Sequence, residues 1–295
     1  MTYRNLLAPM AAAAREVGAL LLAAPRPAPV TSFAELTAAY GAVEAPAAAV
    51  MRRHLNALRP GVDWADEWED SAALPARGEV WVVDVVDGAV QYLQGLPQFC
   101  VSLALVRDGE PVAAALHAPL ADETCLASLG GGATRDGLPI GPSAKTDPAV
   151  AVVATSHPPF AARQPEAAAR AGRSLTAVLP RVAAVRNLGP TSWQIADTAA
   201  GRLDAFWEFG RDDTNLLPGI LVAREAGALV TDAAGRPWRP GADSVLVAPE
   251  GLHRKLVDVL REEPSVDGSR EEPVDVLREE PVGVSREESG AAVAV

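Results

Sequence analysis

The chain has 295 residues, of which 49% are hydrophobic, and a formal net charge of −12. That charge excludes a nucleic-acid partner held through its phosphates, because such binding needs a basic surface. No stretch of 18 or more residues is continuously apolar, so we expect no membrane span. Pro9 interrupts the N-terminal apolar stretch and the two cysteines make no disulfide framework, so we expect a cytoplasmic protein.

Two helical patterns come first in chain order. Residues 3–24 are rich in alanine and leucine and predict a helix, which the proline-rich segment 25–29 ends. A second helical pattern covers Phe33 to Leu58, and we expect interruptions at Gly41 and Pro46.

Strands and helices then follow in mixed order, which predicts an α/β fold with layered α+β packing. Short apolar runs predict strands at Val80–Val83, Phe99–Val106, Val112–His117, Thr124–Ser128, Val150–Ala154 and Ala184–Asn187. Further helical patterns cover Pro165–Leu179, Ser192–Ala200 and Leu216–Ala226. We expect one domain over residues 1–260, made of two subdomains that divide near 145–150.

The C-terminal segment 261–295 differs from the rest of the chain. An Arg-Glu-Glu motif repeats there every eight or nine residues, and the segment carries a net charge of −6. Because it contains prolines and almost no large apolar groups, it cannot bury a core of its own. We therefore expect a disordered, acidic, low-complexity tail.

The most informative segment runs from Trp81 to Gly95. Its apolar start predicts a buried strand that delivers Asp84 and Asp87 into a turn at Gly88. Two carboxylates at this spacing suit a hard divalent cation, and a glycine lets backbone N–H groups approach an anion closely. The segment predicts a site for Mg²⁺ and a phosphate, with a solvated surface turn as the alternative.

The same segment resembles the first signature of the inositol monophosphatase family, Asp-Pro-Ile/Val-Asp-Gly-Thr-x-Asn-Phe/Tyr, usually preceded by Trp-x-Val/Ile. The chain departs from that signature at Val85, Ala89 and Gln91, where the family has proline, threonine and asparagine. Further stretches match in family order at Gly95–Val106, Gly201–Glu208, Gly219–Gly227 and Val230–Gly235. The resemblance covers most of residues 60–260 and implies a sandwich of alternating helix layers and mixed β-sheets.

The resemblance also implies a metal site and catalytic carboxylates. Asp84 and Asp87 correspond to metal ligands, and the carbonyl of Val86 to a third oxygen donor. A glutamate from an earlier segment completes the site and helps to hold the attacking water. Glu67 is our choice for it and Asp66 the alternative, because the usual Glu-Glu pair aligns either way. A solvated acidic loop is the other interpretation of this segment.

Phosphate binding is implied for the backbone N–H groups of Gly88 and Ala89. The family threonine at the second of these positions helps to orient and deprotonate the water. Alanine has no group that exchanges a proton, and general-base assistance typically contributes about 10²–10⁴-fold to the rate. Ala89 therefore predicts a slower enzyme.

The second family signature places a metal-binding aspartate ten residues before a glutamate that corresponds to Glu225. That position is Asn215 in this chain, which keeps an oxygen donor but lacks the negative charge. Because charge tunes hard-cation sites, we expect weaker metal binding. Asp212 or Asp213 would substitute if the loop shifts.

Two further positions concern the substrate. Glu208 corresponds to a residue that hydrogen-bonds substrate hydroxyls, and Thr191 lies in a turn that lines the substrate pocket. Pro190 and Ser192 depart from the Gly-Ser/Thr-Ala-Ala pattern of that turn, so we expect a substrate pocket different from that of an inositol phosphatase.

The resemblance therefore implies a Mg²⁺-dependent phosphomonoesterase that acts on a small sugar, cyclitol or nucleotide phosphate, with a weakened metal site. On this resemblance the chain is identified as a divergent member of the family, with substitutions in both signatures. The alternative is an inactive or repurposed relative that binds a ligand or partner or serves specialised biosynthesis. Family members are commonly dimers, so a homodimer is expected.

Overall fold

The computed structural model describes residues 3–25, 29–65, 74–159 and 161–261, which belong to one compact unit spanning residues 1–264. The acidic tail expected over 261–295 lies outside the described residues, apart from Arg261. Its disorder therefore stays a prediction.

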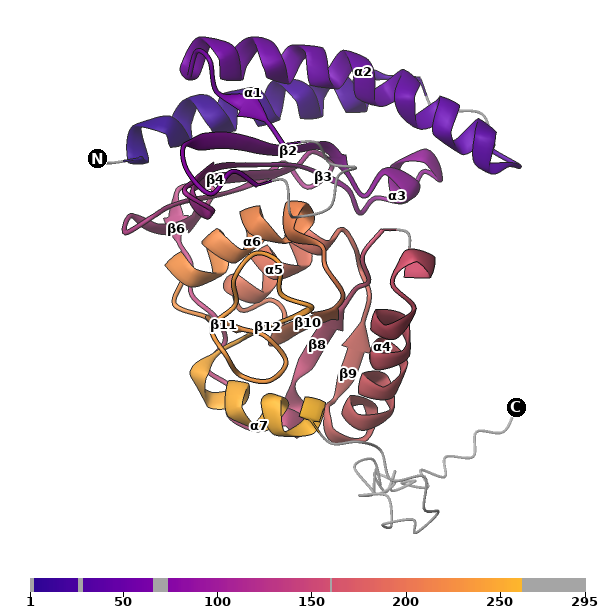
Figure 1. The fold of residues 1–295 in the computed structure, drawn as a ribbon, viewed down its shortest axis with the longest axis vertical. Coiled ribbons are helices and arrows are strands. Elements are labelled where there is room, and N and C mark those ends of the chain that lie inside the picture. Colours follow the sequence, from indigo (N-terminus) through magenta and orange to yellow (C-terminus); the bar gives the residue numbers. More distant parts are fainter. Residues whose placement is uncertain (1–2, 26–28, 66–73, 160, 262–295) are drawn as a thin grey trace, which may run out of the picture. The chain divides into compact units, whose positions relative to one another are not determined.

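The first half of this unit builds a mixed seven-stranded sheet whose strands follow one another in chain order (Figure 1). Its first two strands are parallel, and its other neighbouring pairs are antiparallel. Asp108-Gly109 and Asp136-Gly137 have positive φ values, the conformation that tight hairpin turns require. The strands are β1 (Asp63–Trp64), β2 (Glu79–Asp87), β3 (Cys100–Arg107), β4 (Glu110–Ala118), β5 (Glu123–Ser128), β6 (Gly132–Arg135) and β7 (Leu138–Pro139).

The second half builds a mixed five-stranded sheet in the order β11-β12-β10-β8-β9. Strand β8 is parallel to β9 and β10, whereas β12 is antiparallel to β10 and β11. The strands are β8 (Val152–Thr155), β9 (Ala184–Arg186), β10 (Ala205–Phe209), β11 (Leu229–Thr231) and β12 (Ser244–Ala248). The segment 140–151 joins the two sheets and contains the expected subdomain break near 145–150, which stays a prediction.

Helices cover and separate the sheets. They are α1 (Arg4–Ala23), α2 (Phe33–Leu58), α3 (Ala89–Leu93), α4 (Pro165–Val178), α5 (Thr191–Ala199), α6 (Asp213–Glu225) and α7 (Glu250–Arg261). Short 3₁₀ turns lie at Pro148–Val150, Ala161–Arg163 and Leu179–Arg181.

Three clusters of buried hydrophobic residues arrange these elements in layers (Figure 1). Helices α1 and α2 cover one face of the seven-stranded sheet, α5 and α6 lie between the sheets, and α4 and α7 cover the other face of the second sheet. Along β2, Trp81 packs in the outer cluster and Val82 in the inner one, as strand alternation requires. The predicted α/β sandwich of alternating helix and sheet layers is therefore confirmed.

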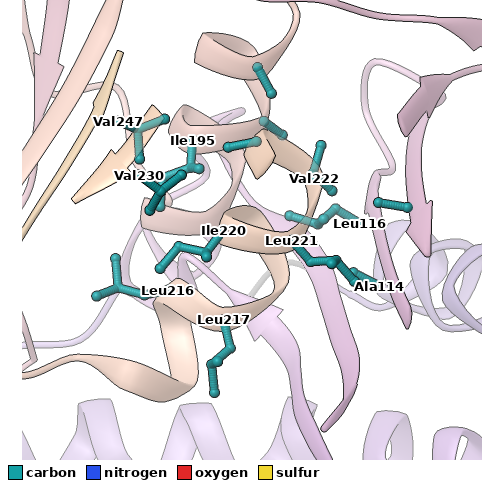
Figure 2. Packing of buried hydrophobic residues seen from close by; sticks show 14 of the residues in the cluster. Ala114, Leu116, Ile195, Leu216, Leu217, Ile220, Leu221, Val222, Val230 and Val247 are labelled. Carbon is teal, nitrogen blue, oxygen red and sulfur yellow. The ribbon is translucent and has the colours of Figure 1, made fainter. Parts of the chain in front are cut away.

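Helix α6 is the centre of the inner layer and is apolar on all sides. Residues 216–223 are all buried, which a helix between two sheets requires. Figure 2 shows Leu116 of β4 on one side of this helix and Val230 of β11 on the other. A Cβ on Gly219 would lie 2.9 Å from the carbonyl oxygen of Ser192, so glycine is needed where α5 and α6 touch. This packing fixes the position of the first turn of α6.

Among the described helices, α1 is the one whose length and apolar composition would allow it to cross a membrane. In this fold Met10, Ala14 and Val17 are fully buried in the cluster that α1 and α2 form with the first sheet. Packing against that sheet accounts for the apolar composition of the helix.

Several elements differ from the sequence-based expectation. Helix α2 runs without interruption through Gly41 and Pro46, because the buried Ala47 and Met51 hold its second half against the sheet. Strand β2 extends beyond the expected Val80–Val83 at both ends. The short α3, the strands β10 to β12 and the helix α7 were not predicted as elements.

Candidate active site

A pocket of about 780 Å³ opens where the two halves of the unit meet. Its walls come from the end of β2, the start of α3, the turn before α5 and the first turn of α6. The start of α2 completes it within the described residues, together with Ser156, His157, Pro159, Arg163 and Gln164. Asp84, Asp87, Gly88, Ala89 and Asn215 all line this pocket, although they are far apart in sequence.

An irregularity in β2 brings its two aspartates to the same side. Asp84 pairs with Ser102 and Asp87 pairs with Cys100, so β2 has one residue more than β3 over this interval. Side chains three residues apart on a regular strand point to opposite faces, and an inserted residue reverses this relation. Both carboxylates therefore line the pocket.

Gly88 is required by its conformation and by its surroundings. Its φ is +88°, and a Cβ there would lie 2.9 Å from the carbonyl oxygen of Gln98. An L-residue would therefore be strained and would collide with the neighbouring backbone. The chain turns at this glycine and begins α3 at Ala89, so both residues line the pocket directly after Asp87.

The negative charges of Asp84 and Asp87 disfavour each other. Asp84 Oδ1 accepts a hydrogen bond of 2.9 Å from the backbone N–H of Val86. Desolvation raises the pKa of the Asp84 carboxyl well above its usual range, and the charge of Asp87 raises it further. Two carboxylates that repel each other at one edge of a pocket are stabilised by a bound cation.

Asp212 brings a further carboxylate to the other side of the pocket. Asn215 Nδ2 donates a hydrogen bond of 2.6 Å to Asp212 Oδ1, and the Asp212 side chain also hydrogen-bonds that of Glu208. Burial raises the pKa of Asp212 well above its usual range, with additional contributions from the charges of Glu208 and Asp87. Asp212 and Asn215 therefore form a hydrogen-bonded pair. The role of Asn215 as a metal ligand stays a prediction.

Glu208 and Thr191, whose substrate-binding roles stay predictions, lie next to each other. Glu208 is 1% exposed, and Thr191 Oγ1 lies 3.4 Å from its Oε2 and 2.9 Å from Ser156 Oγ. Burial raises the pKa of Glu208 to about 8. Hydrogen bonds with the side chains of Asp212, Thr191 and Ser156 lower this pKa in part. Thr191 lines the pocket and connects it to this carboxyl group.

The mouth of the pocket combines positive charge with apolar surface. Arg211 lines it, and Gln164 fixes the backbone there by accepting from Arg211 N at 2.8 Å and donating to Arg211 O at 3.0 Å. Phe33 and Val90 also line the pocket and are 71% and 57% exposed. The mouth can therefore contact both an anionic group and an apolar part of a ligand.

The donors at the end of β2 fit a hard divalent cation. No three His, Cys, Asp or Glu side chains within the described ranges are arranged to hold a metal by themselves. Mg²⁺ does not require such a set, because it commonly uses one or two carboxylates together with waters and substrate phosphate. Asp84 and Asp87 supply these carboxylates. Glu67 and its alternative Asp66 lie outside the described residues, so their roles stay predictions.

Sequence reasoning missed several residues that the fold brings to this site. Ser192 and Cys100 contact Asp87, while His157 and Arg211 line the pocket. The departure of Ser192 from the family turn is a signal that marks this position. The others are recognised only once distant segments are placed together.

Comparisons with known proteins find relatives of this chain. A model described as the inositol monophosphatase family matches residues 7–265. An inositol-1-monophosphatase of Rhizobium meliloti is 31% identical over 215 residues, which span 72% of this chain and 79% of that protein. A protein of Xylella fastidiosa named Nus factor SuhB is 35% identical over 156 residues, 53% of this chain and 56% of its own.

Solved structures have the same fold. The structure of Mycobacterium tuberculosis SuhB matches with a TM-score of 0.73 and 26% identity, covering 90% of this chain and 99% of that one. An inositol monophosphatase from Anabaena matches with a TM-score of 0.73 and 23% identity, covering 89% and 97%. The second likeness concerns the fold alone.

Proposed function

Because the chain belongs to the inositol monophosphatase family, we propose that it is a Mg²⁺-dependent phosphatase acting on a small phosphate monoester. One observation carries this proposal: the irregularity in β2 places Asp84 and Asp87 together in the pocket, directly before Gly88. The carboxylates can ligate a cation, and backbone N–H groups at the neighbouring glycine turn can bind a phosphate group. A sugar, cyclitol or nucleotide phosphate is the proposed substrate class.

In the proposed mechanism, Asp84, Asp87 and Glu67 hold the cation together with the carbonyl of Val86. When bound there, Mg²⁺ would supply a lowered pKa for a ligated water and positive charge opposite the phosphoryl group. The N–H groups of Gly88 and of the residue after it bind phosphate oxygens. Water attacks phosphorus in line and loses a proton as its oxygen bonds to phosphorus. The ester P–O bond breaks, and the leaving oxygen gains a proton in exchange, which gives an alcohol and inorganic phosphate.

Two residues on the other wall orient the leaving group. Thr191 lines the pocket and contacts Glu208, and we propose that this pair binds a hydroxyl of the substrate. With a pKa of about 8, Glu208 is protonated at neutral pH and can donate a hydrogen bond. Arg211 at the mouth suits an additional anionic group, and the exposed rings and methyl groups nearby suit an apolar one.

A direct test combines cation binding with a screen for released phosphate. Calorimetry of the chain with Mg²⁺ and Mn²⁺ should show binding, and a panel of sugar, cyclitol and nucleotide phosphates should include a hydrolysed substrate. Asp84→Asn should abolish both results, whereas Asp258→Asn, an exposed change on α7, should alter neither. No binding at millimolar cation together with no phosphate release would contradict the proposal.

Ala89 makes a further test possible at the reaction step. Ala89→Thr restores a hydroxyl next to Gly88, and general-base assistance is typically worth about 10²–10⁴-fold. We expect a higher kcat with little change in cation affinity. An unchanged kcat would show that the water is activated elsewhere.

A second candidate is a family member that binds a phosphate ligand without hydrolysing it. The absence of a hydroxyl at Ala89 and of a charge at Asn215 favours it. Cation and ligand binding without any phosphate release, both before and after Ala89→Thr, would support this candidate.

The oligomeric state and location also belong to the proposal. We expect a cytoplasmic protein, and we expect a homodimer because family members are commonly dimers. Light scattering on the purified chain measures the oligomeric state directly, and a monomeric mass at micromolar concentration would contradict the dimer.

A further inference from the structure

Two side chains from distant segments converge on one oxygen of Asp87. Ser192 Oγ donates a hydrogen bond to Asp87 Oδ2, and Cys100 Sγ lies 3.6 Å from the same oxygen. Cys100 Sγ and Ser192 Oγ are 3.5 Å apart, so the three groups form a closed triangle. Asp87 is 4% exposed, and the other two residues are fully buried.

The chemistry of the triangle determines the direction of these contacts. An ionised carboxylate only accepts hydrogen bonds, so both partners must supply their protons to it. Because both contacts are made with Oδ2, they oppose rotation of the carboxylate about its Cβ–Cγ bond.

The triangle also joins three elements of the fold. Asp87 ends β2, Cys100 begins β3, and Ser192 lies in the first turn of α5. The residue before Ser192 is Thr191, whose hydroxyl contacts Glu208 on the substrate side. The start of α5 therefore touches both carboxylates through consecutive hydroxyl groups.

We propose that Ser192 and Cys100 are positioning residues, which hold the Asp87 carboxylate in the orientation that cation binding requires. This inference rests on the proposed function, because it assumes that Asp87 is a ligand. Groups that hydrogen-bond a ligating carboxylate typically contribute about 10–100-fold to metal affinity. Ser192 stands where the family turn has alanine, so this contact belongs to the divergent part of the site.

The test is calorimetric titration of the free protein with Mn²⁺ and Mg²⁺, which needs no substrate. Ser192→Ala should weaken cation affinity by about 10–100-fold. Cys100→Ala should weaken cation affinity less than Ser192→Ala does, because a thiol is a weak donor. Cys100→Ser keeps a donor at this position and should keep the wild-type affinity. Thr198→Val is the matched control: it removes a fully buried hydroxyl of the same helix, which donates a hydrogen bond to Gln194 O.

The outcomes separate positioning from packing. Thermal unfolding in chelator measures packing, and we expect Ser192→Ala and Thr198→Val to lower the midpoint to a similar degree. Only the first should weaken cation binding. Equal affinities for wild type, Ser192→Ala and Cys100→Ala would overturn the inference. If Ser192→Ala does not fold, the Cys100→Ala and Cys100→Ser pair decides alone. A wild-type chain that binds neither cation would overturn the proposed function instead.

Discussion

At the pocket, Ala89 and Asn215 lack side-chain groups that the family signatures have at these positions, while the backbone turn and helix start that carry them are present. Ala89 begins α3 directly after the turn at Gly88, whose φ of +88° favours glycine. Asn215 lies in the first turn of α6 and donates to Asp212. The proposed cation and phosphate site therefore differs from the family signatures in its side-chain chemistry at these two positions.

Asn215→Asp should strengthen cation binding about tenfold, because the added charge favours a hard cation. Without a cation it should destabilise the protein, since it replaces a donor to a buried carboxylate by another carboxylate. A lost donor of this kind costs about 1–3 kcal/mol. Calorimetry and thermal unfolding, with chelator and with Mg²⁺, measure both effects.

The control for this change is Asn215→Ala, which removes the donor without adding a charge. It should destabilise the protein in chelator but should not raise cation affinity. Unchanged cation affinity in Asn215→Asp would show that this position is not part of the cation site.

At the scale of elements, two helical glycines have opposite surroundings. A Cβ on Gly18 of α1 would lie 2.7 Å from the ring of His117 and 2.9 Å from that of Pro119. The His117 ring cannot easily move, because its Nδ1 is 3.1 Å from both Glu123 O and Thr124 Oγ1. A Cβ on Gly41 of α2 would meet no atom within 4 Å.

Gly18→Ala should therefore destabilise the protein by about 1–3 kcal/mol through overpacking, despite the better helix propensity of alanine. Gly41→Ala should stabilise it by about 0.5–1 kcal/mol, because only the propensity changes. Denaturant unfolding of the two variants measures both free energies. A gain in stability for Gly18→Ala would contradict the close packing of α1 on the first sheet.

Element-scale prediction from sequence succeeded where apolar runs were long and bounded by breakers. The strand ending at Asp87 and the helix around Leu217 belong to this group. Strand β10 was missed because Ala205–Phe209 was interpreted only as part of a family motif. Helix α2 was expected to break at Pro46, yet tertiary packing overrides the local propensity there.

Prediction of the site reached the residues that match family positions. It named Asp84 and Asp87, but the inserted residue in β2 that turns both toward one pocket could not be read from their spacing. The contact of Ser192 with Asp87 joins residues 105 positions apart, so no local pattern contains it. The effect of Gln164 on Arg211 likewise depends on the packing of two separate segments.

At the scale of the whole molecule, the pocket exists only where both halves of residues 1–264 meet. The first sheet supplies Asp84 and Asp87, whereas the helices α5 and α6 supply Thr191 and Asp212. Neither half carries both the cation donors and the opposite wall. Function therefore depends on the docking of the two sheets through the layer between them.

A chain that ends at Pro264 should keep the stability and function of the full chain, because residues 1–264 form a compact unit. We expect the free energies of unfolding to differ by less than about 0.5 kcal/mol, as for changes remote from the core. Thermal unfolding and cation titration of both chains check this. A clearly lower midpoint for the shortened chain would show that residues 265–295 stabilise the folded unit.

The burial of α6 has a consequence for how such a chain evolves. From Leu216 to Ala223 the helix has no solvent-facing side, so a change of volume at any of these residues disturbs a sheet. One turn earlier, Asp212 and Asn215 face the pocket. Mutation can therefore alter the chemistry of the helix at its first turn while selection preserves the rest. New activities can arise on this scaffold without a new fold.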